Sequence, residues 1–130
     1  MINSNAYNFI NILDKAADAS WKRNDLIANN IANATTPGYK RKDISFNSYL
    51  LAELESTSGS IREQVRKADM SNIISTTYTD MADLSYRLDG NNVDIDHENV
   101  ELASNQILYN TLLDSISYEF NMLKAAMNKN

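Results

Sequence analysis

Apolar and small side chains recur at alternating intervals of three and four residues at both ends of this 130-residue chain. Near the N-terminus the pattern covers Ile10, Leu13, Ala17, Ser20, Asn24, Ile27, Ile31 and Ala34. Near the C-terminus it covers Leu102, Gln106, Tyr109, Leu113, Ile116, Phe120, Leu123 and Met127. Such spacing is typical of helices that pack along one seam. It predicts an all-α fold in which long helices over residues 1–34 and 93–130 pair as a coiled-coil hairpin.

Sequence signals also mark the inner ends of both helices. Pro37 lacks an amide hydrogen and disfavours helix at Thr36, and Gly38 permits a positive φ, so the first helix must end before them. Asp94 or Asp96 can cap the second helix, because a carboxylate accepts hydrogen bonds from the first free N–H groups of a helix. We expect one axial domain formed by residues 1–36 and 93–130, with residues 37–92 as a middle region.

The middle region shows no sustained period and is expected to be small and irregular. Residues 44–54 favour a short helix, and residues 61–67 favour either a helical turn or a strand. Residues 73–78 are rich in β-branched side chains and favour an extended segment. This region is too short to cover two long apolar stripes. The chain is therefore either a self-contained helical bundle or a subunit whose stripes are buried by neighbouring copies or partners.

Composition excludes several classes of protein. A net charge of -5 argues against a nucleic-acid partner, and three scattered glycines cannot form a phosphate-binding or dinucleotide-binding loop. The chain has no Cys for a disulfide, a thiolate metal site or a nucleophile. Its apolar runs are too short to span a bilayer, and its N-terminus has no pattern of a cleaved signal peptide. We expect no catalytic site, no cofactor, no metal and no small-molecule substrate.

Two charged clusters are candidate sites of chemistry. Asp94, Asp96, His97 and Glu98 do not fit an EF-hand counted from Asp89, and one His cannot form a zinc helix motif. These residues are expected to be solvated acids at a helix start rather than the site of a metal-dependent enzyme. The basic run of residues 40–42 could bind a phosphate or an acidic surface, but a solvated loop is the simpler interpretation.

Two segments resemble a known family. Residues 26–40, which read LIANNIANATTPGYK, resemble the N-terminal signature of the bacterial flagellar rod, hook and filament-cap-junction proteins. Residues 88–98, which read LDGNNVDIDHE, and the helix after them resemble the proximal rod members of that family. The positions that carry this resemblance are Asn29, Ala32, Thr36, Pro37, Gly38, Tyr39, Asp89, Gly90, Asn91, Val93 and Asp94.

The resemblance implies a structural subunit of the flagellar basal-body rod that does no chemistry. Its partners would be copies of itself, other rod proteins and the adaptor between the membrane ring and the rod. The candidate assembly contacts include most of the apolar and small positions described above, together with two asparagines of the first signature. They are Ile10, Leu13, Ala17, Asn24, Ile27, Asn30, Ile31, Asn33, Leu102, Tyr109, Leu113, Ile116, Phe120, Leu123 and Met127. The alternative function is a soluble helical adaptor or secretion chaperone that binds a partner helix in a groove.

The resemblance also implies a route to the rod. Early flagellar export substrates engage the type III export gate through a Phe followed four residues later by an apolar residue. Phe46 and Leu50 fit that pattern here, although both are equally suited to an ordinary core. The chain would reach the rod, in the periplasmic space, as an unfolded export substrate without a cleaved signal peptide.

Overall fold

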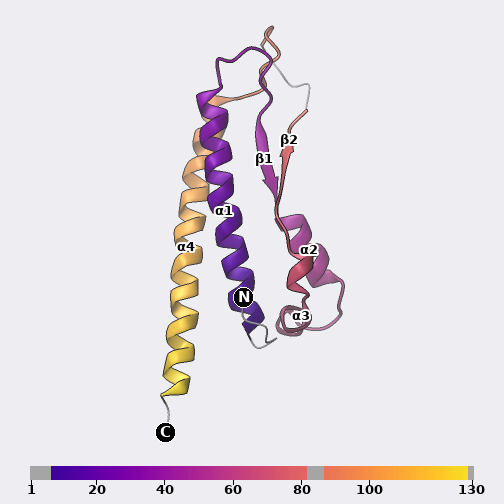
Figure 1. Ribbon diagram of the computed structural model, residues 1–130, viewed down its shortest axis with the longest axis vertical. Helices are drawn as coiled ribbons and strands as arrows, with labels where there is room; N and C mark the ends of the chain where they lie inside the picture. Colours follow the sequence, from indigo (N-terminus) through magenta and orange to yellow (C-terminus); the bar gives the residue numbers. More distant parts are fainter. Residues whose placement is uncertain (1–6, 82–86, 129–130) are drawn as a thin grey trace.

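The computed structural model describes residues 7–81 and 87–128 and is dominated by two long helices (Figure 1). In chain order the elements are α1 (Asn8–Ala32), β1 (Lys42–Ser45), α2 (Asn47–Glu55), α3 (Ile61–Lys67), the 3₁₀ turn η2 (Met70–Asn72), β2 (Thr76–Thr79) and α4 (Ile95–Met127). The predicted hairpin of long terminal helices is confirmed. The six N-terminal residues of the predicted first helix, and residues 129 and 130 of the second, lie outside the described residues.

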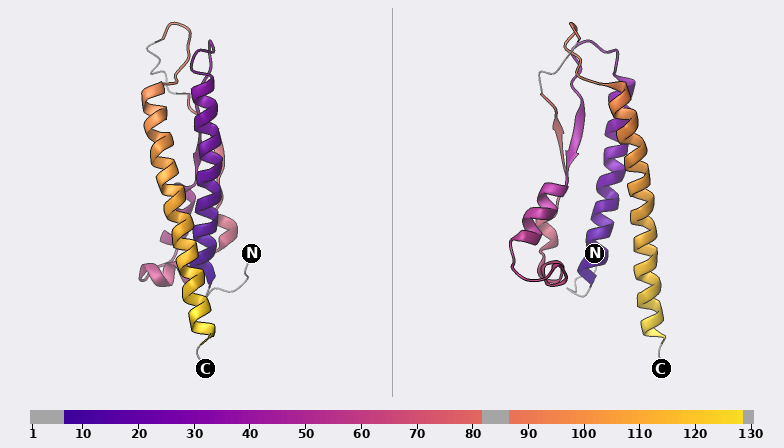
Figure 2. Two further views of the ribbon diagram at one scale, coloured as in Figure 1. Left: turned by 90° about the vertical axis from the view of Figure 1, so that its left-hand side faces the viewer. Right: turned by 180° about the vertical axis from the view of Figure 1, so that it is seen from behind.

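Helices α1 and α4 run antiparallel and lie side by side in every view (Figures 1 and 2). At a rise of about 1.5 Å per residue, the 33 residues of α4 extend beyond the 25 of α1. Asp94 is the N-cap of α4, since its Oδ1 accepts hydrogen bonds from the backbone N–H groups of Asp96 at 3.0 Å and His97 at 3.2 Å. The first of the two predicted caps is therefore the one used.

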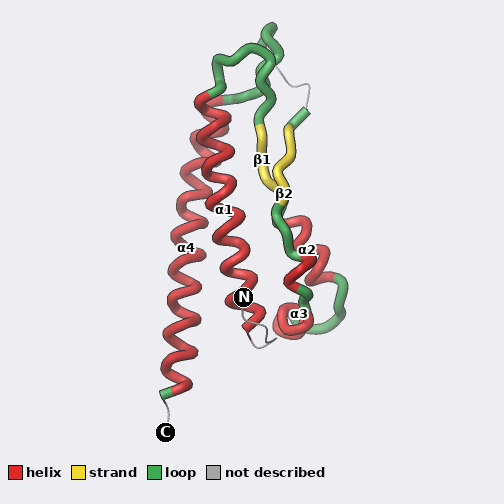
Figure 3. The backbone as a smooth tube through the Cα atoms, in the orientation of Figure 1, coloured by secondary structure: helices red, strands yellow, loops and turns green. Residues whose placement is uncertain are grey.

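The middle region forms an arm, defined here as residues 42–79, that packs on α1 on the side away from α4 (Figures 2 and 3). Strands β1 and β2 pair antiparallel, with Lys42 opposite Thr79 and Ser45 opposite Thr76. Helices α2 and α3 and the turn η2 lie between the two strands in the chain. The predicted extended segment is thus present, and residues 61–67 take the helical of the two alternatives.

The prediction of one helix over residues 44–54 is wrong at its start. Ile44 and Ser45 belong to β1, and α2 begins only at Asn47. The strand exists because Ile44 pairs with Thr77, a residue far along the chain, so local pattern did not reveal it. Phe46, at the junction, turns its side chain into the core and is 8% exposed.

The arm and the first half of α1 share a small hydrophobic core. Its buried members are Ile12, Ala19, Phe46, Ala68 and Ile73. A polar contact fastens the same junction, because Asn8 Nδ2 donates to the carbonyl groups of Val65, Arg66 and Ala68 at 3.0–3.1 Å. These carbonyl groups lie at the C-terminal end of α3, where a helix leaves its last acceptors unpaired. The arm is therefore held by apolar packing and by a side-chain cap from α1.

The face of α4 that meets α1 is displaced from the predicted seam. Leu102, Tyr109, Ile116 and Leu123 are partly buried, but Gln106, Leu113, Phe120 and Met127 are exposed. Glu98, Asn105, Leu112 and Glu119 are buried or partly buried as well, and they follow one another at intervals of seven residues. Glu101 and Ser115 are also partly buried. Polar partners on α1 and the arm cause this displacement, since Asn105 Nδ2 donates to the Ser20 carbonyl at 2.8 Å.

We predict that Ile27→Ala destabilises the folded chain by about 2–5 kcal/mol, because Ile27 is fully buried and truncation leaves a cavity. The matched control is Ile107→Ala, which makes the same change in the other long helix at a side chain that is 69% exposed. It should change the free energy of unfolding by less than about 0.5 kcal/mol. Urea denaturation followed by circular dichroism measures both. Equal effects of the two variants would contradict the packing described here.

Candidate functional site

The loop that ends α1 is shaped by the first signature. Asn33 closes the helix, with its backbone N–H donating to the carbonyl groups of Asn29 and Asn30. The chain then turns through residues 34–38, and Gly38 has a φ of 72°, a conformation that favours glycine. The Tyr39 N–H donates to the Thr36 carbonyl at 3.2 Å and completes the turn. The exposed Pro37 cannot continue a helix, so the chain reverses direction here.

The second signature lies directly against this loop. The Gly38 N–H donates to the Asp89 carbonyl at 2.7 Å, and Lys40 Nζ donates to the Gly90 carbonyl at 2.6 Å. Gly90 has a φ of 76°, and a Cβ added there would lie 3.8 Å from the Cα of Gly38. Arg87 donates to the carbonyl group of Ala34. Residues 33–41 and 87–94 thus form one unit, which we name the loop clasp.

Asn91 is the centre of the loop clasp. It is 1% exposed, and its Nδ2 donates to the carbonyl groups of Asn33 at 2.9 Å and Thr36 at 2.8 Å. Its Oδ1 accepts from the Val93 N–H at 2.8 Å. One amide side chain therefore satisfies backbone groups of both loops, and a side chain of another shape cannot supply both donors and the acceptor.

A buried polar network continues from the loop clasp into the helices. Asn30 is fully buried, and its Oδ1 accepts from the Lys42 N–H at 2.9 Å and from the Tyr39 hydroxyl at 3.2 Å. Its Nδ2 donates to the Lys42 carbonyl at 2.8 Å and to Glu98 Oε2 at 3.1 Å. Asn30 thereby links α1 to β1 and to α4 with one side chain.

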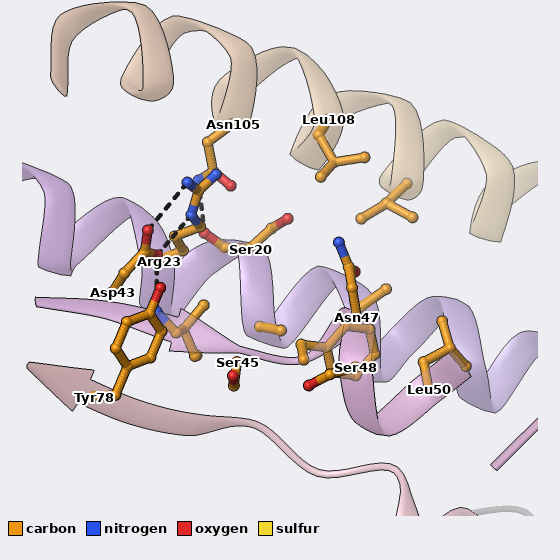
Figure 4. A pocket seen from close by; sticks show the side chains of 15 residues that line it. Ser20, Arg23, Asp43, Ser45, Asn47, Ser48, Leu50, Tyr78, Asn105 and Leu108 are labelled. Carbon is orange, nitrogen blue, oxygen red and sulfur yellow. Dashed lines mark hydrogen bonds and ion pairs between the residues drawn. The ribbon is translucent and has the colours of Figure 1, made fainter. Parts of the chain in front are cut away.

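Two arginines form ion pairs with the acidic groups of this network. Arg41 Nε donates to Glu98 Oε1 at 2.5 Å, and the same guanidinium contacts Asp43 and Asp80. Arg23 Nε donates to Asp43 Oδ1 at 2.8 Å, at the wall of a cavity of about 480 Å³ between α1, α4 and the arm (Figure 4). Arg23 also reaches Glu101 of α4 at 2.6 Å. The two cations thus tie both helices to β1.

The pKa shifts follow from this pairing. Burial raises the pKa of Asp43, but hydrogen bonds from Arg23, the Ile44 N–H and Arg41 outweigh burial and leave it below its ordinary value. Burial lowers the pKa of Arg41, yet its hydrogen bonds to Glu98 and Asp43 leave it above its ordinary value. Asp43 therefore contributes stability above the ordinary pKa of an Asp, and this is lost as pH falls through its lowered native pKa.

The structure places the predicted residues in three environments. The seam positions of α1 are buried or partly buried, as are Asn30 and Asn33. Within the signatures, Asn91 and Val93 are buried, Tyr39, Asp89 and Gly90 are partly buried, and Asn29, Ala32, Thr36, Pro37, Gly38 and Asp94 are exposed. Phe46 is buried and Leu50 packs partly buried beside it, so both belong to the core shared by α1 and the arm.

Two expectations about charged residues are wrong. Glu98 is not a solvated acid, because it is fully buried between Asn30 and Arg41. Arg41 is not part of a solvated loop, since its side chain is only 12% exposed. Pattern reasoning missed them because both lie in polar, charge-rich stretches of sequence, and the two partners are 57 residues apart. Glu98 does lie one heptad before Asn105, in the buried register of α4, and that spacing was the available signal.

The described side chains of the site form hydrogen bonds and ion pairs that hold the surrounding elements together. Among residues 7–81 and 87–128, no three His, Asp or Glu side chains gather where they could hold a metal ion. None of the described helices is long and apolar enough to cross a membrane. What the arrangement can do is fix the angle and register of α1, α4 and the arm.

We predict that Arg41→Met destabilises the folded chain by about 3–5 kcal/mol, because it leaves the buried Glu98 carboxylate without its cation. The neighbouring Lys42→Met, at an exposed side chain, should change stability by less than about 0.5 kcal/mol. The double variant Arg41→Met/Glu98→Met should recover most of the loss, since the fully buried carboxylate is removed together with its cation, and Asp43 keeps its ion pair with Arg23. Chemical denaturation of the four proteins checks this. A double variant no more stable than Arg41→Met would contradict the pairing.

Comparison with known proteins agrees with the resemblance. The family model described as "Flagella basal body rod protein" matches residues 10–40. The flagellar basal body rod protein FlgB of Bacillus subtilis (strain 168) is 40% identical over 117 residues, covering 88% of this chain and 89% of that protein. FlgB of Escherichia coli (strain K12) is 32% identical over 132 residues, covering 88% and 86%. The chain therefore belongs to the FlgB family of flagellar basal body rod proteins, which are structural subunits and not enzymes.

Proposed function

We propose that this chain builds the proximal part of the rod by packing its long helices against neighbouring subunits. The supporting observation is the outer surface of α4, which remains apolar although α1 covers one side of it. Its large exposed apolar side chains are Ile95, Val100, Ile107, Leu108, Leu113, Tyr118, Phe120, Met122 and Met127. So many exposed apolar side chains on one helix are typical of surfaces that are buried by partners.

The proposed partners are copies of this chain, other rod proteins and the adaptor that joins the rod base to the membrane ring. Leu113 is 40% exposed, Phe120 is 47% exposed and Met127 is 74% exposed. All three belong to the predicted seam, and α1 of the same chain does not cover them. These side chains can therefore pack against a helix of a neighbouring subunit.

The loop clasp and the ion network suit a subunit that transmits torque. Arg23, Arg41 and Asn30 join α1, α4 and the arm through buried or partly buried polar contacts. Such contacts have a defined direction, so sliding or rotating one helix past the other would leave buried charges unpaired. A subunit held in this way passes a load between its neighbours without changing its own shape.

We predict that Leu113→Asp abolishes rod assembly and swimming while the monomer still folds. A carboxylate is costly inside an apolar interface, but at this partly exposed position it is solvated in the free chain. Swimming in soft agar and recovery of the chain in isolated basal bodies report assembly, and circular dichroism reports folding. The control is Ser117→Asp, at an exposed position of the same helix outside the predicted seam, which should swim normally. Normal swimming by Leu113→Asp would refute the proposal.

We further propose that Phe46 and Leu50 engage the type III export gate. Both side chains pack in the core shared by α1 and the arm, so the folded chain hides them. A gate that reads them must act on the unfolded chain, and folding after export then buries the same residues. The periplasmic rod would thus receive a chain that cannot be exported again.

We predict that Phe46→Leu lowers the amount of exported chain severalfold. The change keeps an apolar side chain of similar size, and its effect on stability should stay under about 1.5 kcal/mol. Ile73→Val, in the same core, is the matched control and should leave export unchanged. The amount of exported chain in the periplasm and medium is compared by immunoblot in cells that lack the other rod proteins. Equal export of both variants would assign Phe46 to the core alone.

A further inference from the structure

The cavity between α1, α4 and the arm is a groove that opens to solvent (Figure 4). Small residues of α1 form its floor, and α4 and the arm supply its two walls. Leu108 on one wall is 49% exposed and Tyr78 on the other is 46% exposed, so a second molecule can reach the groove. We name it the arm groove and define it by Ala16, Ala19, Ser48, Tyr78, Leu108 and Leu112.

The arm groove has room for large apolar side chains. Its volume is about 480 Å³, whereas an apolar cavity of about 150 Å³ already takes up benzene. The charged residues that line it are Arg23 and Asp43, and they form an ion pair with each other. The lining therefore presents no charge without a partner, and it suits an apolar or aromatic occupant.

Another side of the helical pair carries a protruding aromatic side chain. Trp21 is the single tryptophan of the chain and is 56% exposed. It follows Ala19 by two residues, and at 3.6 residues per turn such positions point to nearly opposite sides of a helix. Its ring lies beside that of Tyr109 on α4, with centroids 5.6 Å apart. Leu113, one turn after Tyr109 on the same face, is 40% exposed, and we name Trp21 and Leu113 the ridge.

The ridge and the arm groove lie at the same level along the long helices. Trp21 is two residues from Ala19 of the groove floor, and Leu113 directly follows Leu112 of the groove wall. The ridge cannot enter the groove of its own chain, because the two surfaces lie on different sides of α1. A second copy that stands beside the first, with its helices parallel, brings its ridge to the groove without a large shift along the helices. Because the two surfaces differ, the contact repeats from copy to copy as a ring or a helical array.

Charge favours the same arrangement. Asp14, Asp18 and Asp25 are exposed and lie on the face of α1 that carries Trp21, since they are seven and three residues before it and four after it. None of these aspartates forms an ion pair with a described residue. The arm carries α3, which packs toward the start of α1 and has three basic residues against Glu63. Opposite charge thus guides the ridge side of one copy toward the arm of the next.

We propose that Trp21 and Leu113 of one copy pack into the arm groove of a second copy of this chain that stands beside it. The inference rests on the proposed rod assembly and specifies a lateral contact within it. The indole ring covers the small residues of the groove floor, and its N–H donates to the Ser48 hydroxyl, because a buried tryptophan usually pairs this donor. Tryptophan is also one of the residue types enriched among side chains that dominate the binding energy of interfaces.

The chain contains no cysteine, so introduced thiols can mark the contact. The two changes are Asn110→Cys, beside Trp21, and Ser48→Cys, in the arm groove, both at exposed positions. Two differently tagged copies, each with one change, are co-expressed in flagellated cells, and isolated basal bodies are treated with a short bismaleimide. Crosslinked pairs that contain both tags should form only when both thiols are present.

Removing the indole ring should break the contact. Trp21→Ala, added to the Asn110→Cys copy, should lower the crosslinked fraction of the incorporated chain at least about tenfold, the loss expected for a central tryptophan of an interface. Tyr118→Ala is the matched control, because it truncates another exposed aromatic side chain, on α4 and outside the ridge. It should leave the crosslinked fraction unchanged. Trp21→Phe replaces Trp21→Ala should the latter copy not enter basal bodies.

The outcomes separate this contact from the function on which it rests. If both tagged copies enter basal bodies and no crosslink forms, the groove is covered by another protein or stays open, and the inference is overturned. Equal effects of the tryptophan and tyrosine changes overturn it as well. If the wild-type chain itself is absent from basal bodies, the proposed function fails. The pair Gln106→Cys and Asn47→Cys repeats the measurement from neighbouring exposed positions should one of the first variants fail to assemble.

Discussion

Glu98 is the residue on which the arrangement of the long helices depends. It is fully buried on α4, and its two oxygens reach different elements, Asn30 of α1 and Arg41 beside β1. A buried carboxylate is tolerated only when its charge is compensated and its lone pairs are bonded. That requirement fixes where α4 lies along α1. Apolar packing alone would not fix it, because the small residues of the α1 seam permit several registers.

The contacts of Glu98 also determine which face of α4 is buried along the rest of the helix. Glu98 and Asn105 are turned toward α1, and the buried face continues at intervals of seven residues through Leu112 and Glu119. Leu113 and Phe120, one residue further, are then turned outward. Helix α4 thus keeps exposed apolar side chains that neighbours can cover. The same polar contacts that stabilise the subunit expose the surface that makes it an assembly protein.

The two signature segments act as one structural unit although about 50 residues separate them in the chain. Asn91 bonds the carbonyl groups that follow α1, and Lys40 bonds the Gly90 carbonyl. Their glycines lie close because both loops turn sharply at the same end of the molecule. The arm can vary in size without disturbing this unit, because it leaves and re-enters the helical pair through β1 and β2.

The sequence by itself determined the long helices, the end of the first helix before Pro37, a cap of the second helix by Asp94 or Asp96, and the family, since these depend on local spacing and on contiguous motifs. It also indicated the extended segment that became β2. Only the tertiary structure decided that residues 42–45 are a strand, that Arg41 and Glu98 are buried, and which face of α4 meets α1. Each of these depends on pairing between residues far apart in the chain, such as Ile44 with Thr77 and Asn30 with Glu98. Periodicity reports which side chains share a face, but the partner of a charged or polar residue is set by the folded chain.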